Sequence, residues 1–413
     1  MSTMPYRLAS TPSVERSDPD GTARRSTHRD LSAGVLAVEA HEAAGIARLE
    51  PDWVGLVDRC LEPNVFLDPD FCLPLVAHMA PRRLVVLAVW GPGDAAGRRL
   101  LGVCPLMSAG LPFRRLAASW THELCALAAP LLDRDHAAAA LDAILAWLAR
   151  FWPECGAWLI PALVADGLTA RLIASLAERT GRRIQYFADG RRAVLRASAD
   201  EPAGLEAVSG RKAKELRRQR RRLSGRGVLA YASATSGEAL RTAIEDFLAL
   251  ERQGWKGRRG TALLQRPGQA AFIRAMTDRM ATRGTSRIDS LTLDGKPIAM
   301  GIVLSSAGRD YFWKTAYDES FAEASPGVQF VLELTQRQSL WPQPDLTDSC
   351  ARPDHPMIDH LWRGRIDMAD MMIAVEPGAP RRFARLVRLE RLRRRGRARL
   401  KRLANLLRRA SGP

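Results

Sequence analysis

The sequence lacks the features that mark secreted and membrane-spanning proteins. Its six cysteines are widely spaced with no C-x-x-C pair, and a chain of 413 residues needs no disulfide staples, so they are interpreted as reduced core thiols. No apolar run reaches the roughly 18 residues that a transmembrane helix needs. The first thirty residues also lack the apolar segment of a secretion signal. We therefore predict a cytoplasmic protein.

Metal-binding and P-loop signatures are absent as well. No H-E-x-x-H motif, Cys/His cluster or acidic triad appears, and these are the arrangements that hold catalytic or structural metal ions. Gly254–Thr261 contains three glycines and a lysine. The lysine is not followed by Ser or Thr with the glycine spacing of a P-loop. The sequence therefore predicts no metal site and no P-loop.

Basic residues are abundant but unevenly distributed. The formal net charge is +17. Residues 381–413 hold fourteen Lys or Arg and one Glu, a net charge of +13, which leaves +4 for the remaining 380 residues. Arg211–Arg226 contributes +8. The composition therefore requires two basic segments, and it does not require a basic groove over the whole protein.

Length and periodicity indicate two α/β halves with the same order of elements. In each half, helices precede a meander of strands, and a further helix and further strands follow. The predicted divisions are a disordered leader at 1–32, an N-terminal half at 33–197, a linker at 198–209, a C-terminal half at 210–378 and a basic amphipathic tail at 379–413.

The clearest local pattern is a three-strand meander followed by a helix start. The strand-like runs, separated by Asp294-Gly295 and Ala307-Gly308, are Arg287–Leu293, Pro297–Ser305 and Asp310–Ala316. Ser325-Pro326-Gly327 then opens a helix, with Ser as the N-cap and Pro at the first helical position. The backbone N–H groups at such a start are suited to holding a phosphate or carboxylate.

Roughly residues 200–375 resemble the acetyl-CoA-binding core of the GNAT acyltransferases. They are most similar to the CelD/BcsL-type and FemAB-like branch, often labelled BioF2-like acetyltransferase domains. The residues that carry the resemblance are Arg211–Leu223, Gly254–Arg258, Gly260–Ala262, Leu293–Ala299, Lys314–Glu319, Phe321, Ser325–Gly327 and Asp348. The usual Gln/Arg-x-x-Gly-x-Gly/Ala pyrophosphate loop is absent, and Ser325–Gly327 stands in its place. The identity of the acyl donor therefore stays open.

The resemblance implies an α/β (α+β) fold of two tandem GNAT-like halves, each a mixed, mostly antiparallel sheet flanked by helices. It implies transfer of an acetyl or acyl group from a CoA thioester to an amine or hydroxyl. The implied acceptor is a sugar, cell-envelope or cellulose-type exopolysaccharide precursor, with acetyl-CoA as co-substrate. A FemAB-like transfer of an aminoacyl group from tRNA is an alternative. A non-catalytic accessory protein of a polysaccharide-synthesis complex is another.

Acyl transfer needs a base, donors for the tetrahedral oxyanion and a group that protonates the leaving thiolate. Lys314, Tyr317 and Asp318 stand at the end of the third meander strand, and Asp348 stands on the next strand. We predict these four as catalytic residues, with Lys314 and Tyr317 as the leading pair for proton transfer or charge stabilisation. These two could equally be ordinary rim residues. The predicted donor-binding residues are Ser325, Gly327 and Val328.

Two basic segments and one histidine supply the predicted substrate contacts. The helix Arg211–Leu223 is more basic than solubility requires, although a solvated face is the alternative. It has no helix-turn-helix pattern or interleaved aromatics that would favour nucleic acid. Gly254–Thr261 is predicted as a glycine-rich loop that combines a tryptophan with three bases and contacts a ligand. Its alternative role is a helix C-cap and connection. The predicted substrate-binding residues are Lys212, Arg217, Trp255, Lys256, Arg258 and His355.

The basic tail is predicted to form two short amphipathic helices, with a possible break in the helix at Gly396 between them. The apolar positions, three or four residues apart among the bases, are Leu386, Leu389, Leu392, Leu400, Leu403 and Leu407. This pattern is typical of a helix that lies on an anionic membrane surface, here the inner membrane surface. We therefore predict a surface anchor that is separable from the active site. The alternatives are a helix packed on the domain and a nucleic-acid contact.

Overall fold

The computed structural model describes residues 24–30, 34–81, 83–93, 97–108, 115–196, 202–338 and 344–410. The first half contains β1 (Arg24–Asp30), β2 (Gly34–Glu42), the 3-10 helix η1 (Ala43–Leu49), α1 (Glu50–Asp58), η2 (Val65–Leu67), α2 (Pro69–Met79), β3 (Val85–Pro92), β4 (Arg98–Ser108), β5 (Arg115–Ser119), β6 (Leu131–Leu132), α3 (Ala137–Phe151), β7 (Cys155–Val164), α4 (Leu168–Thr180) and β8 (Ile184–Arg196).

The second half contains α5 (Gly210–Ser224), β9 (Leu229–Ala234), α6 (Gly237–Gln253), α7 (Trp255–Arg258), η4 (Leu263–Gln265), α8 (Pro267–Thr282), β10 (Ser286–Leu293), β11 (Lys296–Ser306), β12 (Arg309–Tyr317), η5 (Glu319–Ala324), α9 (Pro326–Gln338), β13 (Leu346–Asp348), α10 (Ile358–Leu361), β14 (Gly364–Ala374) and α11 (Pro380–Ala410). The predicted meander, the helix start at Pro326 and the basic helix are all present.

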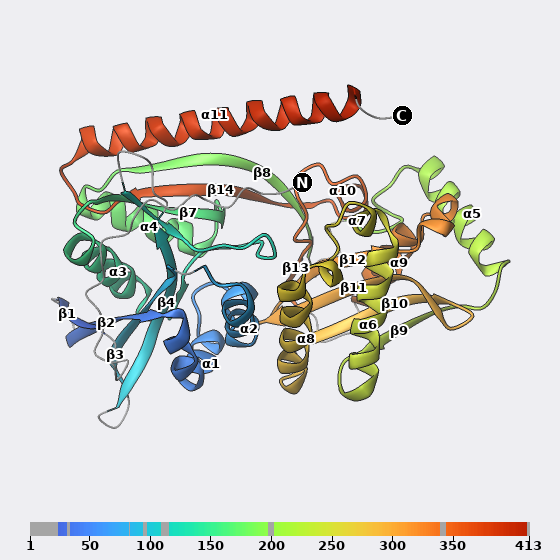
Figure 1. The fold of residues 1–413 in the computed structure, drawn as a ribbon, viewed down its shortest axis with the longest axis horizontal. Helices are drawn as coiled ribbons and strands as arrows, with labels where there is room; N and C mark the ends of the chain where they lie inside the picture. Colours follow the sequence, from blue (N-terminus) through green and yellow to red (C-terminus); the bar gives the residue numbers. More distant parts are fainter. Residues whose placement is uncertain are drawn as a thin grey trace.

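The described strands form one continuous sheet (Figure 1). Its order is β1-β2-β3-β4-β5-β7-β14-β8-β13-β12-β11-β10-β9, with β6 paired to β4. Neighbours are antiparallel except in the pairs β5–β7 and β12–β13. The predicted class, a mixed and mostly antiparallel sheet flanked by helices, is confirmed. The expectation of one sheet in each half is corrected, because β8 and β13 join the two edges.

Both halves repeat one order of elements and exchange a strand. Each runs strand, two helices, three-stranded meander, helix, parallel strand, helix and antiparallel strand. The last strand, β14, belongs to the second half in the sequence, but it lies between β7 and β8 of the first half. In return, β8 pairs with β13 of the second half. Each half therefore completes the sheet of the other.

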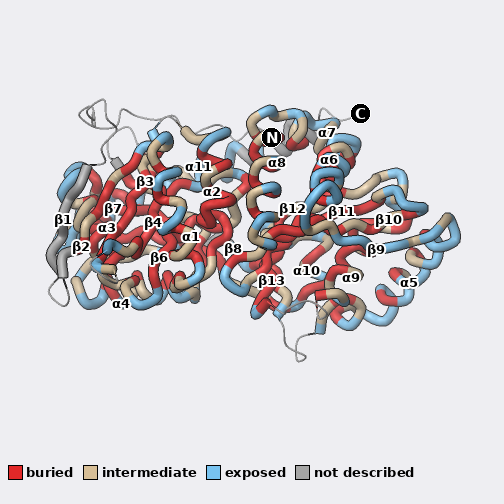
Figure 2. The backbone as a smooth tube through the Cα atoms, turned by 90° about the horizontal axis from the view of Figure 1, so that it is seen from below, coloured by how far each residue is buried: buried red, intermediate tan, exposed pale blue. Residues whose placement is uncertain are grey.

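One hydrophobic core crosses the boundary between the halves. It joins α1 and α2 to α6 and α8 on one face of the sheet. The Phe71 ring meets Phe272 and Trp313 edge-on, with centroids 5.2 Å and 5.5 Å away. Arg283 of the second half donates to Asp68 and Asp70 of the first. Figure 2 shows the buried residues concentrated along this shared sheet, so the halves pack as one body.

Other helices cover the opposite face. There α3 and α4 pack on the first half, while α5, α9 and α10 pack on the second. Within α5, Ala213, Leu216 and Leu223 are buried, and the exposed side carries the bases. This half-buried stripe explains why so basic a segment is an ordered helix, because packing of an apolar face supplies most helix stability in proteins.

The two chain ends differ from the sequence prediction. Residues 1–23 of the predicted leader lie outside the described residues, but Arg24–Asp30 forms β1 beside β2. Backbone pairing of this kind needs no apolar side chains, so composition did not reveal it. The tail is a single helix, α11, which continues through Gly396. An exposed glycine costs a helix only about 1 kcal/mol, which is too little to divide it.

Candidate active site

The bulged strand β12 lies at the centre of the candidate site. It pairs with β13 only from Arg309 to Tyr311. On its other side Ile302 faces Lys314 while Val303 faces Phe312, so β12 carries one extra residue in a β-bulge. A bulge bends its strand. Beyond Tyr311, the β13 side of β12 has no strand partner among the described residues.

This bulge decides which face of the sheet receives Lys314. Trp313 belongs to the core cluster beneath α6 and α8. Strict alternation would place the next residue on the opposite face. Because of the extra residue, Lys314 instead faces Ile302, which lies in the same cluster as Trp313. Its Nζ atom is 5.3 Å from the centroid of the Trp313 ring.

The surroundings of Lys314 change its acidity. Burial lowers the pKa of the amine to about 8, and the positive charge of Lys256 also lowers it, while Glu251 and Glu123 oppose these effects. Loss of hydration disfavours the ammonium form, which is the physical cause of the shift. Near neutral pH a larger fraction of Lys314 than of an ordinary lysine is therefore unprotonated and able to accept a proton.

Two glutamates from different halves lie near Lys314. Glu251 is 4% exposed, and it accepts hydrogen bonds from Lys256 Nζ at 2.6 Å and from the Leu263 amide at 2.8 Å. Glu123 of the first half accepts from Arg266 Nη1 at 2.5 Å and also from Gln269. The site is therefore built between the halves.

Asp348 lies at the end of β13, and both of its oxygens are occupied. One accepts from Arg192 Nη1 at 3.0 Å and the other from the Cys350 amide at 2.8 Å. Arg192 also donates to the carbonyl of Ala126 at 3.0 Å. Asp348 is only 2% exposed. This carboxylate therefore fixes the end of β13 against the first half, and the geometry favours a positioning role.

Lys314 and Tyr317 do not meet, which corrects their prediction as a pair. Tyr317 faces Ala299 and packs in the cluster beneath α9, on the face opposite Trp313. Residues three apart on a strand point to opposite faces. The sheet therefore separates the two side chains, and a joint proton transfer between them has no support in the geometry.

The start of α9 offers fewer free donors than its sequence indicates. Pro326 has no N–H, and the amides of Val328 and Gln329 donate to the Ser325 carbonyl at 2.9 Å and 3.1 Å. Gly327 is buried, and a Cβ atom there would lie 3.2 Å from Tyr317 Cδ1. Phosphate binding by Ser325, Gly327 and Val328 stays a prediction. Substitution of Gly327 would disturb packing and would not test it.

The glycine-rich segment forms a short helix, α7, where a loop was expected. Gly257 is required there, because a Cβ atom would lie 1.6 Å from the carbonyl oxygen of Arg252. The Trp255 amide donates to Glu319 Oε1 at 2.7 Å, and Arg258 Nη2 donates to Glu319 Oε2 at 2.6 Å. The Trp255 side chain is 42% exposed. This packing presents Lys256 to the Lys314 cluster while Trp255 faces solvent.

Comparison with known families adds an observation about the second half. Residues 210–338 match a family model described as an acetyltransferase (GNAT) domain. The match covers α5 through α9 and therefore includes the bulged strand and Lys314. It supports an acyltransferase of the GNAT type, as expected from the sequence. The BioF2-like and CelD-type subdivision stays a prediction. No curated protein matches the chain significantly.

Several solved structures are similar in overall arrangement. A conserved protein of unknown function from Bacteroides thetaiotaomicron is 13% identical, with a TM-score of 0.49, over 79% of this chain and 96% of that one. FemX is 11% identical, with a TM-score of 0.47, over 77% and 95%. The C-terminal domain of a putative lysylphosphatidylglycerol synthetase from Agrobacterium fabrum is 12% identical, with a TM-score of 0.47, over 82% and 95%. Similarity at this level says nothing about substrate.

The remaining predicted residues of the GNAT-type segment and its surroundings lie apart from Lys314. Lys212 and Arg217 are exposed on α5, across the sheet. The Asp318 side chain accepts from the Ser320 amide at 2.9 Å and caps η5. His355 Nδ1 accepts from the Met357 amide at 3.4 Å, and burial lowers its pKa. The structure gives Asp318 and His355 capping roles, and substrate contact by Lys212, Arg217 and His355 stays a prediction.

Sequence reasoning missed most of the neighbours of Lys314. These neighbours come from three separate segments, and they are Glu251, Cys350 and the adjacent residues His122 and Glu123. Burial lowers the pKa of His122, whose Nδ1 accepts from the Leu124 amide at 3.3 Å. Burial also raises the pKa of the Cys350 thiol well above its ordinary value. No local motif marks these residues, and only an amphipathic reading of α6 would have placed Glu251 on its buried side.

Two negative observations hold for the described residues. Their helices do not combine the length and apolarity that crossing a bilayer requires. Their His, Cys, Asp and Glu side chains form no group of three or more that is placed to hold a metal ion.

Proposed function

We propose that the protein transfers an acyl group from a CoA thioester to an amine or hydroxyl at the bulged end of β12. The observation that carries this proposal is Lys314, an amine with a pKa of about 8, beside an unpaired strand edge within the GNAT-type segment. An unpaired edge presents backbone N–H and C=O groups that can bond an extended chain. The amide-bearing arm of CoA is a chain of this kind.

In this mechanism neutral Lys314 acts as the general base. The acceptor nitrogen or oxygen attacks the thioester carbonyl while its proton passes to Lys314 Nζ. Collapse of the tetrahedral intermediate breaks the C–S bond, and the proton then passes to the departing CoA sulfur, which regenerates the neutral amine. Lys256 and Glu251 form a salt bridge beside this amine. Their opposite charges shift the pKa of Lys314 in opposite directions.

The acceptor class follows from the sequence resemblance to BioF2-like and CelD-type proteins. We propose a sugar, cell-envelope or exopolysaccharide precursor, with acetyl-CoA as the first donor to test. The direct experiment measures equilibrium binding by calorimetry, with acetyl-CoA and aminoacyl-tRNA titrated separately. Binding of acetyl-CoA supports the proposal. Binding of aminoacyl-tRNA alone would favour the FemAB-like alternative, and binding of neither would favour a non-catalytic role.

The pH dependence should report the state of Lys314. Its lowered pKa means that the amine is protonated below pH of about 8 and neutral above it. Because a base must be neutral, we expect kcat/KM for acyl transfer to rise with pH and to level off above that value. Initial rates across this range, at saturating and limiting acceptor, measure the effect. A fall above the same pH would assign Lys314 to oxyanion stabilisation as an ammonium ion.

A further inference from the structure

The long helix α11 has two sides of different chemistry. It lies along the sheet over β7, β14 and β8, on the face opposite α3 and α4 (Figure 1). Its inward side chains Phe383, Leu386 and Val387 are buried. The exposed residues that recur three or four apart, and therefore share the outward side, are Arg381, Arg385, Arg388, Leu392, Arg395, Arg399 and Arg402.

Within the described part of the chain, the outward arginines have no anionic partner. The one acidic residue of α11, Glu390, is 1% exposed and faces inward. It accepts from Arg393 and Arg394 at 2.5 Å and 2.8 Å, and Arg394 also donates to Asp370. Among the described residues, none forms an ion pair or hydrogen bond with the side chains of the six outward arginines.

The exposed side of α6 mixes its charges, unlike the outward side of α11. On α6, Arg241 lies 3.0 Å from Glu238, and Glu245 of the same helix accepts from Arg274 of α8 at 2.5 Å. Like charges at three- and four-residue spacing repel, and this repulsion destabilises a helix. The outward face of α11 therefore carries a cost that solubility alone does not require. An external polyanion would remove that cost.

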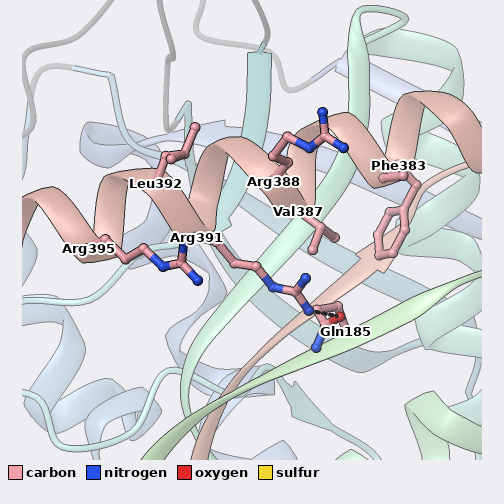
Figure 3. A pocket seen from close by; sticks show the side chains of 8 residues that line it. Gln185, Phe383, Val387, Arg388, Arg391, Leu392 and Arg395 are labelled. Atoms are coloured by element: carbon pink, nitrogen blue, oxygen red, sulfur yellow. Dashed lines mark hydrogen bonds between the residues drawn. The ribbon is translucent and has the colours of Figure 1, made fainter.

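Apolar groups accompany these arginines. Leu392, Leu400 and Leu403 are 55%, 68% and 56% exposed. Beside them a groove of about 500 Å³ lies between α11 and β8 (Figure 3). Its lining includes Gln185 of β8 and, from α11, Phe383, Val387, Arg388, Leu392 and Arg395. Arg391 closes one side by donating to Gln185 Oε1 at 2.9 Å. The surface thus offers cations and apolar contact together.

We propose that the outward face of α11 binds the surface of an anionic phospholipid membrane. A helix of 31 residues is about 46 Å long, so its arginine line can meet many headgroup phosphates at once. The exposed leucines reach the acyl boundary, where burial of apolar surface adds to binding. Nucleic acid fits less well, because the outward line has no aromatic side chain to stack on bases and exposes leucines instead.

Deletion of the tail does not test this proposal. Phe383, Leu386 and Val387 fill the cluster against β7 and β14, so a truncation after Pro380 would expose a core. The expectation of a separable tail is corrected on this ground. Charge reversal on the outward side leaves that core intact and is the appropriate change.

The test compares two variants with the same change of net charge. One carries Arg385→Glu, Arg388→Glu, Arg395→Glu and Arg399→Glu. The control carries Arg211→Glu, Lys214→Glu, Arg221→Glu and Arg222→Glu on exposed positions of α5. Binding to vesicles of phosphatidylcholine with about one-third phosphatidylglycerol should fall at least about a hundredfold in the first variant only, since each base contributes roughly fivefold.

A second pair of measurements distinguishes lipid from other partners. Leu392→Asn, Leu400→Asn and Leu403→Asn together should also weaken vesicle binding, at least about tenfold, because apolar insertion is lost. If the α5 control loses vesicle binding equally, the effect comes from overall net charge, and the proposal is wrong. Wild-type binding to vesicles by the α11 arginine variant would also overturn the proposal. Tight RNA binding that the arginine variant loses and the leucine variant keeps would replace lipid with nucleic acid.

Discussion

Replacement of Lys314 with methionine should lower kcat/KM for acyl transfer by about 10²–10⁴-fold, the usual contribution of a positioned base. Methionine keeps the length and packing of the side chain but cannot accept a proton. The affinity for acetyl-CoA should change little, because the proposed role belongs to the transition state. Steady-state kinetics and calorimetric binding measure the two quantities. Lys296→Met, at an exposed position of the β10–β11 hairpin, is the matched control.

Stability separates this role from a structural one. The folded-state pKa of Lys314 is lowered to about 8, so below that pH folding must keep an ammonium ion in a place that disfavours it. This cost lowers the free energy of unfolding. The loss is recovered only as pH rises from the pKa of Lys314 in the folded protein to its higher pKa in the unfolded chain. At neutral pH the methionine variant should therefore be at least as stable as wild type. A variant that is both active and less stable would remove Lys314 from the mechanism.

Local patterns in the sequence predicted the elements but not their pairing. The hairpin dipeptides at Asp294 and Ala307 placed the meander, and Pro326 placed the start of α9. The bulge at Trp313 depends on the register between β11 and β12, which no local pattern records. Because the bulge sets the direction of Lys314, the sequence could identify this lysine as a candidate and still pair it wrongly with Tyr317.

Long-range pairing explains the other differences. β14 inserts between β7 and β8, whose residues stand far earlier in the chain, and helix or strand periodicity says nothing about such partners. The same holds for Glu123 and Glu251, which meet Lys314 from opposite halves. Gly257 shows the converse case. Glycine at this position suggested a flexible loop. The structure requires glycine there because the Arg252 carbonyl approaches too closely for any side chain.

A buried ionic network in the second half carries the largest expected effect on stability. Arg287 is 7% exposed, and its nitrogens lie 3.0 Å from Asp289 Oδ2 and 3.2 Å from Asp310 Oδ2. It also donates to Gln338 Oε1 at 3.0 Å. The two carboxylates are 1% and 6% exposed. The guanidinium therefore neutralises both acids where water is excluded, and it joins β10 and β12 to the end of α9.

Arg287→Met should lower the free energy of unfolding by about 3–5 kcal/mol, because it leaves buried carboxylates without their cation. Urea unfolding at neutral pH measures the loss, and Arg241→Met, in an exposed ion pair, should change stability by less than about 1 kcal/mol. Adding Asp289→Asn and Asp310→Asn to Arg287→Met should restore part of the loss, since no unpaired charge then stays buried. The deficit of the single variant should also shrink on acidification, because burial without a cation raises a carboxylate pKa and allows protonation. A deficit that neither substitution nor acid reduces would show that Arg287 stabilises the fold by packing rather than by its charge.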